Sequence, residues 1–367
     1  MVLGPCLNVR PGEVVTIESW SHALPWALAL VREARRCRAE PVLVVEDEET
    51  FFASLTLSPS RSIVRSPPAL VAGSDAYVYL PGPESFPRLF GLGDRDLHTI
   101  VARHGSAWWR AAERRRVRFA RLSIAAATPT AAERFGIDLD SWQRQVWRSS
   151  LYPPGQLHRR GARLARRLAR ARRIRIRHPN GTDFSSEVAR EGVIIEDARV
   201  DPSDRSVGHL GTQIPSGLVT VPLRAGTASG IWESNRRTYL RYLDPPTTLG
   251  ARWAFREGRL KEYSFDRGGE AFAASYSRSG PGRDRVDRLT FGLNPAIGWA
   301  PELEEIEEHT ITLWLGGEGG HGSRSRPPFS FGSPLAGAEV ELDGTRWWVD
   351  GRTVPRRAGG SRTPSRR

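Results

Sequence analysis

The chain has 367 residues, of which 39% are hydrophobic, so it has enough apolar material for one large domain or two smaller ones. Its 54 Lys and Arg residues exceed its 41 Asp and Glu residues, and the formal net charge of +13 favours an acidic partner. Cys6 and Cys37 are the only cysteines, which excludes a disulfide-rich secreted scaffold and a cysteine-ligated zinc or iron–sulfur site.

The N-terminal region contains neither a secretory signal nor a membrane span. Residues 1–12 lack a basic region followed by an apolar run. The most apolar stretch, 20–31, contains His22 and Pro25 and is too short to cross a bilayer. We therefore expect a soluble cytoplasmic protein without a membrane partner.

The first third of the chain has the pattern of an α/β domain. Strands are predicted at 13–17 and 41–45, the second buried on both faces, with a helix at 24–39 between them. Strand, helix and apolar strand at this spacing form a βαβ unit with a parallel sheet. Further elements are expected in this order: a strand at 76–80, a basic helix at 108–118 and a strand at 121–127.

The rest of the chain changes from helices to short strands. The predicted helices are 131–136, 140–150 and 161–173. Apolar runs between glycine turns then predict strands at 174–177, 192–196, 217–221, 285–292, 309–315, 338–342 and 346–349. Strands at such spacing indicate a domain built largely on β-sheet.

These patterns predict an α/β protein with two domains. We expect an N-terminal parallel α/β domain at 1–120 and a larger mixed, strand-rich C-terminal domain at 121–355, with the boundary falling somewhere between Gly105 and Ala127. Residues 356–367 have almost no apolar side chains and are expected to form a disordered basic tail.

The local motifs give little support to any common enzyme class. A glycine-rich run at 317–322 matches the dinucleotide fingerprint, but Pro327 and Pro328 follow where that fingerprint needs a helix. Neither a nucleophile elbow nor a phosphate-binding loop with a lysine is present. The arginine run 163–173 has no interleaved aromatic residues, so nucleic acid is not the favoured partner.

An acidic segment precedes His309 and raises the hypothesis of a metal site. Its carboxylates are Glu302, Glu304, Glu305, Glu307 and Glu308. Crowding along the sequence does not place ligands around one point, so we expect a solvated, arginine-pairing segment. The other histidines are scattered, and structural or surface roles are expected for them.

Several phrases, in order over nearly the whole chain, resemble the thermophilic aminopeptidase T family of two-metal exopeptidases. They stand at 10–17, 128–137, 181–184, 214–222, 291–295 and 309–317. The resemblance implies an aminopeptidase-T-like fold and a homodimer.

The residues at the family's metal-ligand positions depart from its pattern. Leu218 and Arg288 match two glutamate ligands, Thr312 matches a histidine, and the family's His-x-Asp pair falls near 329–331. Two-metal hydrolysis needs carboxylates and imidazoles to hold both ions. His309 stands three residues before Thr312 on a predicted strand and so points to the other face. The resemblance therefore implies a degenerate member with no catalytic residue, metal or cofactor.

We therefore predict a non-catalytic protein that binds an acidic or extended peptide and presents it to a partner modifying enzyme. Modification of a ribosomally made precursor peptide is one setting, because leader segments of such peptides are commonly acidic. Arg288 is expected to pair with a peptide carboxylate. The candidate peptide-binding residues are Leu218, Arg288, Asn294, Trp299, Thr312, Trp314, Phe329 and Phe331.

Two alternatives remain open at this point. The first is an active metal-dependent aminopeptidase or hydrolase whose rearranged site draws on His309, His321 and the carboxylates of 304–308. Metal content distinguishes it from a binding protein. The second is a nucleic-acid-binding protein driven by arginine, which predicts a steep salt dependence of affinity.

Overall fold

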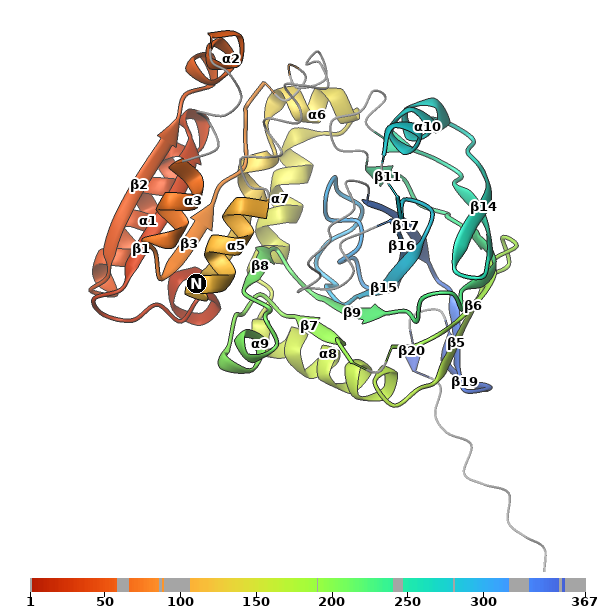
Figure 1. The fold of residues 1–367 in the computed structure, drawn as a ribbon. Helices are drawn as coiled ribbons and strands as arrows, with labels where there is room; N and C mark the ends of the chain where they lie inside the picture. Colours follow the sequence, from red (N-terminus) through yellow and green to blue (C-terminus); the bar gives the residue numbers. More distant parts are fainter. Residues whose placement is uncertain are drawn as a thin grey trace, which may run out of the picture.

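Three large sheets organise the described part of the chain. The computed structural model describes residues 2–57, 66–85, 88, 106–189, 191–239, 247–279, 281–316, 330–349 and 352–353. Within them, a five-stranded parallel sheet lies at the left of Figure 1 and two antiparallel sheets, of eight and five strands, lie at the right. The predicted basic tail and Phe329 lie outside the described residues.

The parallel sheet has the strand order β2-β1-β3-β4-β8. Its strands are β1 (Val14–Trp20), β2 (Glu40–Glu46), β3 (Ala76–Tyr79), β4 (Arg118–Leu122) and β8 (Gly211–Ile214). All four pairings are parallel, which confirms the predicted βαβ arrangement. The predicted burial of β2 on both faces is wrong, because β2 is an edge strand and most of its residues are only partly buried.

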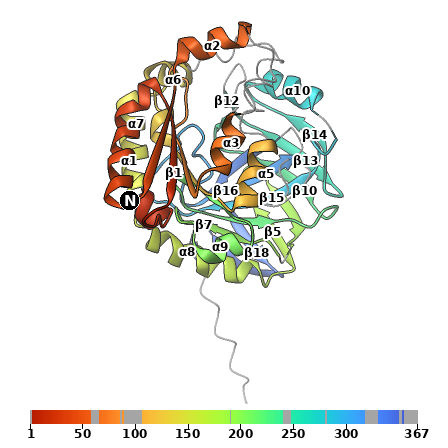
Figure 2. The same ribbon diagram turned by 60° about the vertical axis from the view of Figure 1, so that its left-hand side comes forward.

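Helices cover both faces of this sheet. They are α1 (Leu24–Arg36), α3 (Ser66–Ala72) and α5 (Ser106–Arg115), with α2 (Glu48–Leu57) at one end. Figure 2 shows α1 on one side of β1, and α3 with α5 on the other. The strand predicted at 121–127 begins earlier, at Arg118, and residues 123–126 form a 3-10 turn instead. The division predicted after residue 120 thus falls inside β4, and β8 comes from far beyond it.

Three helices connect the parallel sheet to the antiparallel sheets. They are α6 (Pro129–Phe135), α7 (Leu139–Ser150) and α8 (Pro154–Leu168). Gly136 ends α6 in the left-handed conformation, with φ +61°. The predicted range 161–173 misplaces both ends of α8, because a proline starts the helix and the end of the arginine run belongs to the next strand. In the described part of the chain, helices are too short or too polar to cross a membrane.

The strand-rich half contains one large antiparallel sheet and one smaller one. The eight-stranded sheet runs β14-β13-β10-β6-β5-β18-β19-β20, and the five-stranded sheet runs β17-β16-β15-β9-β7. The strands of the larger sheet are β5 (Arg173–Arg177), β6 (Asp183–Glu187), β10 (Ser229–Glu233), β13 (Arg252–Arg256), β14 (Arg259–Ser264), β18 (Glu339–Leu342), β19 (Thr345–Val349) and β20 (Arg352–Thr353). Those of the smaller sheet are β7 (Ile194–Glu196), β9 (Leu218–Pro222), β15 (Val286–Gly292), β16 (Thr310–Gly316) and β17 (Ser330–Ala336).

A short strand pair and two further α-helices complete the described strands and α-helices. They are β11 (Thr238–Tyr239), β12 (Thr247–Thr248), α9 (Pro202–Ser206) and α10 (Gly269–Arg278).

The largest hydrophobic core lies between the two antiparallel sheets. Phe184, Trp232 and Trp253 enter it from the larger sheet, and Leu289 and Phe291 enter it from β15. The indole N–H groups of the two tryptophans are satisfied by Ser333, one by its carbonyl at 3.1 Å and one by its hydroxyl at 2.9 Å. This packing leaves the other face of β15 and its neighbours for a different role.

Candidate functional site

The face of the five-stranded sheet that points away from the large core carries polar residues. Paired residues of antiparallel strands stand on the same face. Thr290 of β15 pairs with Thr312 of β16 and with Thr220 of β9, so three threonines form a row across three strands. The next row places Arg288 opposite Trp314. We call these five residues the threonine face.

Arg288 is the cation of the threonine face. Its guanidinium carbon lies 4.4 Å from the centroid of the Trp314 ring, and Nη1 donates to Asp287 Oδ2 at 2.6 Å. The side chain of Arg288 is only 20% exposed. Trp314 Nε1 donates in turn to Thr290 Oγ1 at 3.2 Å. The guanidinium therefore lies over an aromatic ring, and one of its N–H groups is bonded to the Asp287 carboxylate.

Glu305 reaches the same face from the acidic segment. Gly292 makes this possible, since a Cβ there would lie 2.0 Å from the carbonyl oxygen of Glu307. Thr290 Oγ1 donates to Glu305 Oε2 at 3.1 Å. Burial, followed by repulsion from Glu196, raises the pKa of Glu305 to about 7, although Arg288 opposes the shift. The expectation of a wholly solvated acidic segment is therefore wrong at Glu305.

Other carboxylates of the acidic segment form ion pairs with arginines from distant parts of the chain. Glu302 pairs with Arg121, Glu308 pairs with Arg160, and Glu307 pairs with Arg236 at 3.1 Å. The predicted pairing with arginine is confirmed for these residues. The ion pairs fasten the segment over one end of the sheet, where Glu305 meets Thr290.

Two predicted residues accompany Arg288 and Trp314 on this sheet face. Thr312 is 1% exposed, and among the described residues its hydroxyl has no hydrogen-bond partner. Leu218 pairs with Gly292 at the far end of the face. It belongs to a separate small core that also contains Trp142 and Leu303, so its present role is packing.

Asn294 is a structural residue of the turn after β15. Its side chain is fully buried, and Nδ2 donates to the carbonyls of Ser216 at 2.8 Å and Ser149 at 3.2 Å. Its Oδ1 accepts from the backbone N–H of Ala296 at 3.0 Å. With these bonds made, Asn294 joins α7, the β8–β9 connection and β15, so its expected place in a peptide site is not supported.

Phe331 points away from the threonine face, and Trp299 lies in the segment that follows β15. The expectation for Phe331 is wrong: it pairs with Leu315, one residue beyond Trp314, and therefore points to the opposite face. Its ring packs in the large core, 5.0 Å from Phe272 and 5.3 Å from Trp253. Trp299 follows β15 in an irregular segment, where Nε1 donates to the carbonyl of Arg237 at 3.0 Å.

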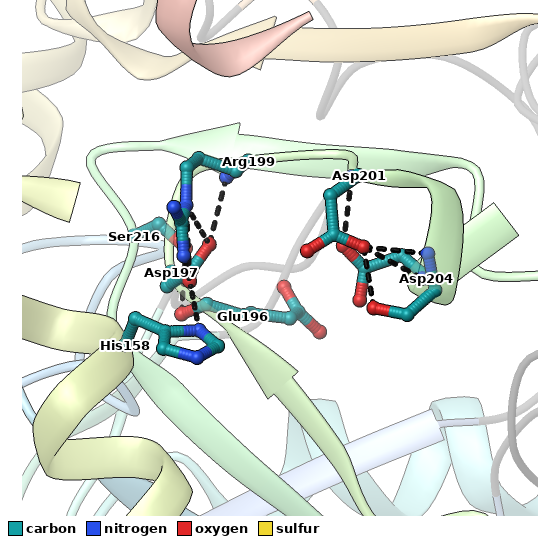
Figure 3. A network of polar contacts seen from close by, with 8 residues as sticks. His158, Glu196, Asp197, Arg199, Asp201, Asp204 and Ser216 are labelled. Atoms are coloured by element: carbon teal, nitrogen blue, oxygen red, sulfur yellow. Dashed lines mark hydrogen bonds and ion pairs between the residues drawn. The ribbon is translucent and has the colours of Figure 1, made fainter. Parts of the chain in front are cut away.

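A second polar network fixes the strand that carries Glu196. His158 Nδ1 of α8 lies 2.8 Å from Asp197 Oδ2, and Arg199 Nη2 donates to the same oxygen at 2.6 Å (Figure 3). The Asp197 side chain is 5% exposed. Ser216 Oγ donates to the carbonyl of Glu196 at 3.1 Å. The network thus ties α8 and the β8–β9 connection to the end of β7.

Sequence reasoning missed this network, because its residues have no local spacing. His158 and Asp197 are 39 positions apart, and they meet only because α8 packs against β7. Close by, Asp201 and Asp204 form a capping box at α9. Burial, with repulsion from Asp201 and Asp197, raises the pKa of Asp204 to about 6.

A metal ion would need several ligands that surround one point among the described residues. Within them, no group of three or more His, Cys, Asp or Glu side chains could hold a metal ion. His309 stands immediately before β16 with φ +73°, and its Nε2 lies 3.9 Å from Glu308 Oε2. His321, the other histidine of the metal hypothesis, lies outside the described residues.

Comparison with known proteins shows a shared fold. Neither a protein-family model nor a curated protein matches the sequence. Wild-type AmpT from Thermus thermophilus matches the structure with a TM-score of 0.69 and 17% identity over 96% of each chain. The 2,5-dihydroxypyridine dioxygenase from Pseudomonas putida KT2440 matches with a TM-score of 0.60 and 13% identity, over 94% of this chain and 92% of that one. The chain therefore has an AmpT-like fold, as the sequence resemblance predicted.

Proposed function

We propose that the chain is a non-catalytic peptide-binding protein, in which Arg288 and Trp314, the less buried end of the threonine face, receive an acidic or extended peptide. The observation that carries this proposal is the position of Arg288 on Trp314. A guanidinium offers a planar fork of N–H donors that suits a carboxylate, and partial burial strengthens such a bond. The hydroxyl of Thr312, which has no hydrogen-bond partner among the described residues, is a further polar group on the same face.

The residues at the matched ligand positions support binding over hydrolysis. Leu218 has no ligand atom, and Arg288 carries a permanent positive charge that repels a metal ion. With Thr312 as the third matched residue, the set does not fit a two-metal centre. The bound peptide would therefore stay intact.

The proposed cellular role follows from the chemistry of the peptide. A net charge of +13 suits an acidic leader segment of a precursor peptide. A cytoplasmic homodimer would present that peptide to a partner modifying enzyme.

The test is a binding titration by fluorescence anisotropy. The probe is a short synthetic peptide of alternating leucine and glutamate with fluorescein at its carboxyl end. Arg288→Glu is expected to raise the Kd about tenfold or more, equivalent to ~1.4 kcal/mol, because a cation is replaced by a repelling anion. Circular dichroism checks that the variant is folded.

Arg283→Glu is the matched control. Its guanidinium also stacks on an aromatic ring, 4.7 Å from the centroid of Tyr276, but on the side of α10. The same charge change there is expected to leave the Kd unchanged. Equal affinities of the two variants would count against the threonine face. A labelled oligonucleotide that binds more tightly than the peptide, with a steep salt dependence, would favour nucleic acid instead.

A further inference from the structure

An exposed pair of tryptophans bridges α1 and α7. Trp26 is 42% exposed and Trp147 is 49% exposed, and their ring centroids are 5.6 Å apart at an angle of 38°. Leu151, one turn after Trp147, is 53% exposed. Exposed apolar side chains that gather in one place mark interaction surfaces, and tryptophan is the residue most enriched at their energetic centres.

The exposed face of α7 also carries two cations. Arg144, Trp147, Arg148 and Leu151 follow the spacing i, i+3, i+4 and i+7, which places them on one side of the helix. The opposite side is buried through Trp142, Val146 and Ser149. The repeat that buries one side of α7 thus exposes this combination of arginine and large apolar residues.

The arginines are available to a partner. Arg144 and Arg148, with Ser141 and Gln145, line a surface pocket of about 470 Å³. The Arg144 side chain is 73% exposed, and its Nη2 is 3.9 Å from Asp138 Oδ1, too long for a hydrogen bond. Arg148 donates to the backbone carbonyl of Ala296 at 3.2 Å. Because a carbonyl has no net charge, this bond holds the side chain without neutralising its positive charge.

We propose that Trp26, Arg144, Trp147, Arg148 and Leu151, the α1–α7 face, dock a partner protein through an acidic amphipathic segment. Carboxylates of that segment would meet the two arginines, and its apolar side chains would cover the tryptophans and Leu151. Charge selects this occupant over a second copy of the chain, because a second copy would bring the same arginines and another net charge of +13. The surface is separate from the threonine face and does not depend on the proposed function.

The test uses a synthetic helical peptide that has leucine on one face and glutamate on the other. Its Kd is measured by anisotropy with the wild-type chain and with Arg144→Glu/Arg148→Glu. The double reversal variant is expected to bind the glutamate–leucine peptide at least tenfold more weakly than the wild type does. It is also expected to bind the matching lysine–leucine peptide more tightly than the wild type does. That exchange of charge preference is a result that a merely damaged fold cannot give.

Two controls and one further variant complete the test. Trp147→Ala is expected to weaken binding of the glutamate–leucine peptide. Leu28→Ala, which removes a side chain that is 40% exposed elsewhere on α1, and Arg288→Glu are each expected to leave it unchanged. Equal Kd values for the double reversal and Leu28→Ala would overturn the proposal. So would a wild-type dimer, seen by analytical ultracentrifugation, that Trp147→Ala converts to a monomer.

Discussion

Glu305 places an acid with a raised pKa beside the cation of the threonine face. Its position could not be predicted from the sequence, where it is one of five similar carboxylates. It differs from the others because Gly292 lets the backbone of the acidic segment lie directly on the sheet. Thr290 then accepts from Trp314 and donates to Glu305, which joins three elements in one hydrogen-bonded chain.

The raised pKa predicts a specific pH dependence of stability. The folded chain binds the Glu305 proton more tightly than the unfolded chain, so this group's contribution is greatest below its ordinary pKa of 4.5 and is lost as pH rises through about 7. Glu305→Gln is expected to remove that decline. Above pH 7, the variant is expected to exceed the wild type in free energy of unfolding by on the order of 2 kcal/mol.

Urea unfolding followed by tryptophan fluorescence across this pH range measures the effect. Glu133→Gln, at an exposed position of α6, is the control and is expected to follow the wild-type profile. If Glu305→Gln also followed that profile, the account of a buried, proton-binding carboxyl would fail.

At the scale of elements, the sequence predicted where strands occur better than which strands pair with one another. Every strand expected after residue 174 is present, because each is a short apolar run between turns. The strands that were missed include β6, β10, β13 and β14, whose less buried positions carry charged or small residues that hide the alternation. Register is not readable locally, so the sequence could not show that Arg288 stands opposite Trp314, or that Phe331 points to the other face of the sheet.

The contact between α8 and β7 gives a prediction at this scale. Asp197→Asn removes the charge that Arg199 and His158 share, and leaves the arginine beside a neutral amide. The expected loss is about 2–4 kcal/mol in the free energy of unfolding, because the Asp197 side chain is almost fully buried.

An exposed ion pair provides the comparison for Asp197. Asp183 pairs with Arg175 at 2.6 Å, with both side chains near half exposure. Asp183→Asn is expected to cost less than about 1 kcal/mol in the same urea titration. Similar losses for both variants would show that the buried network does not hold α8 against β7.

For the whole molecule, the fold alone does not determine which chemistry the chain performs. The parallel sheet and the strand-rich half were predicted, and the AmpT-like fold agrees with them. The same fold also matches a dioxygenase, so the architecture does not select a reaction. The proposed function therefore rests on the residues of the threonine face, where an arginine lies over a tryptophan at a position that the resemblance matches to a metal ligand.

The most direct measurement is the mass of a peptide after contact with the protein. The alternating leucine–glutamate peptide, with a free amino end, is incubated with the chain in the presence of zinc, cobalt or manganese, or of a chelator. We predict the same Kd in every condition and a peptide of unchanged mass. Removal of N-terminal residues that depends on added metal would contradict a binding role and establish a working metallopeptidase.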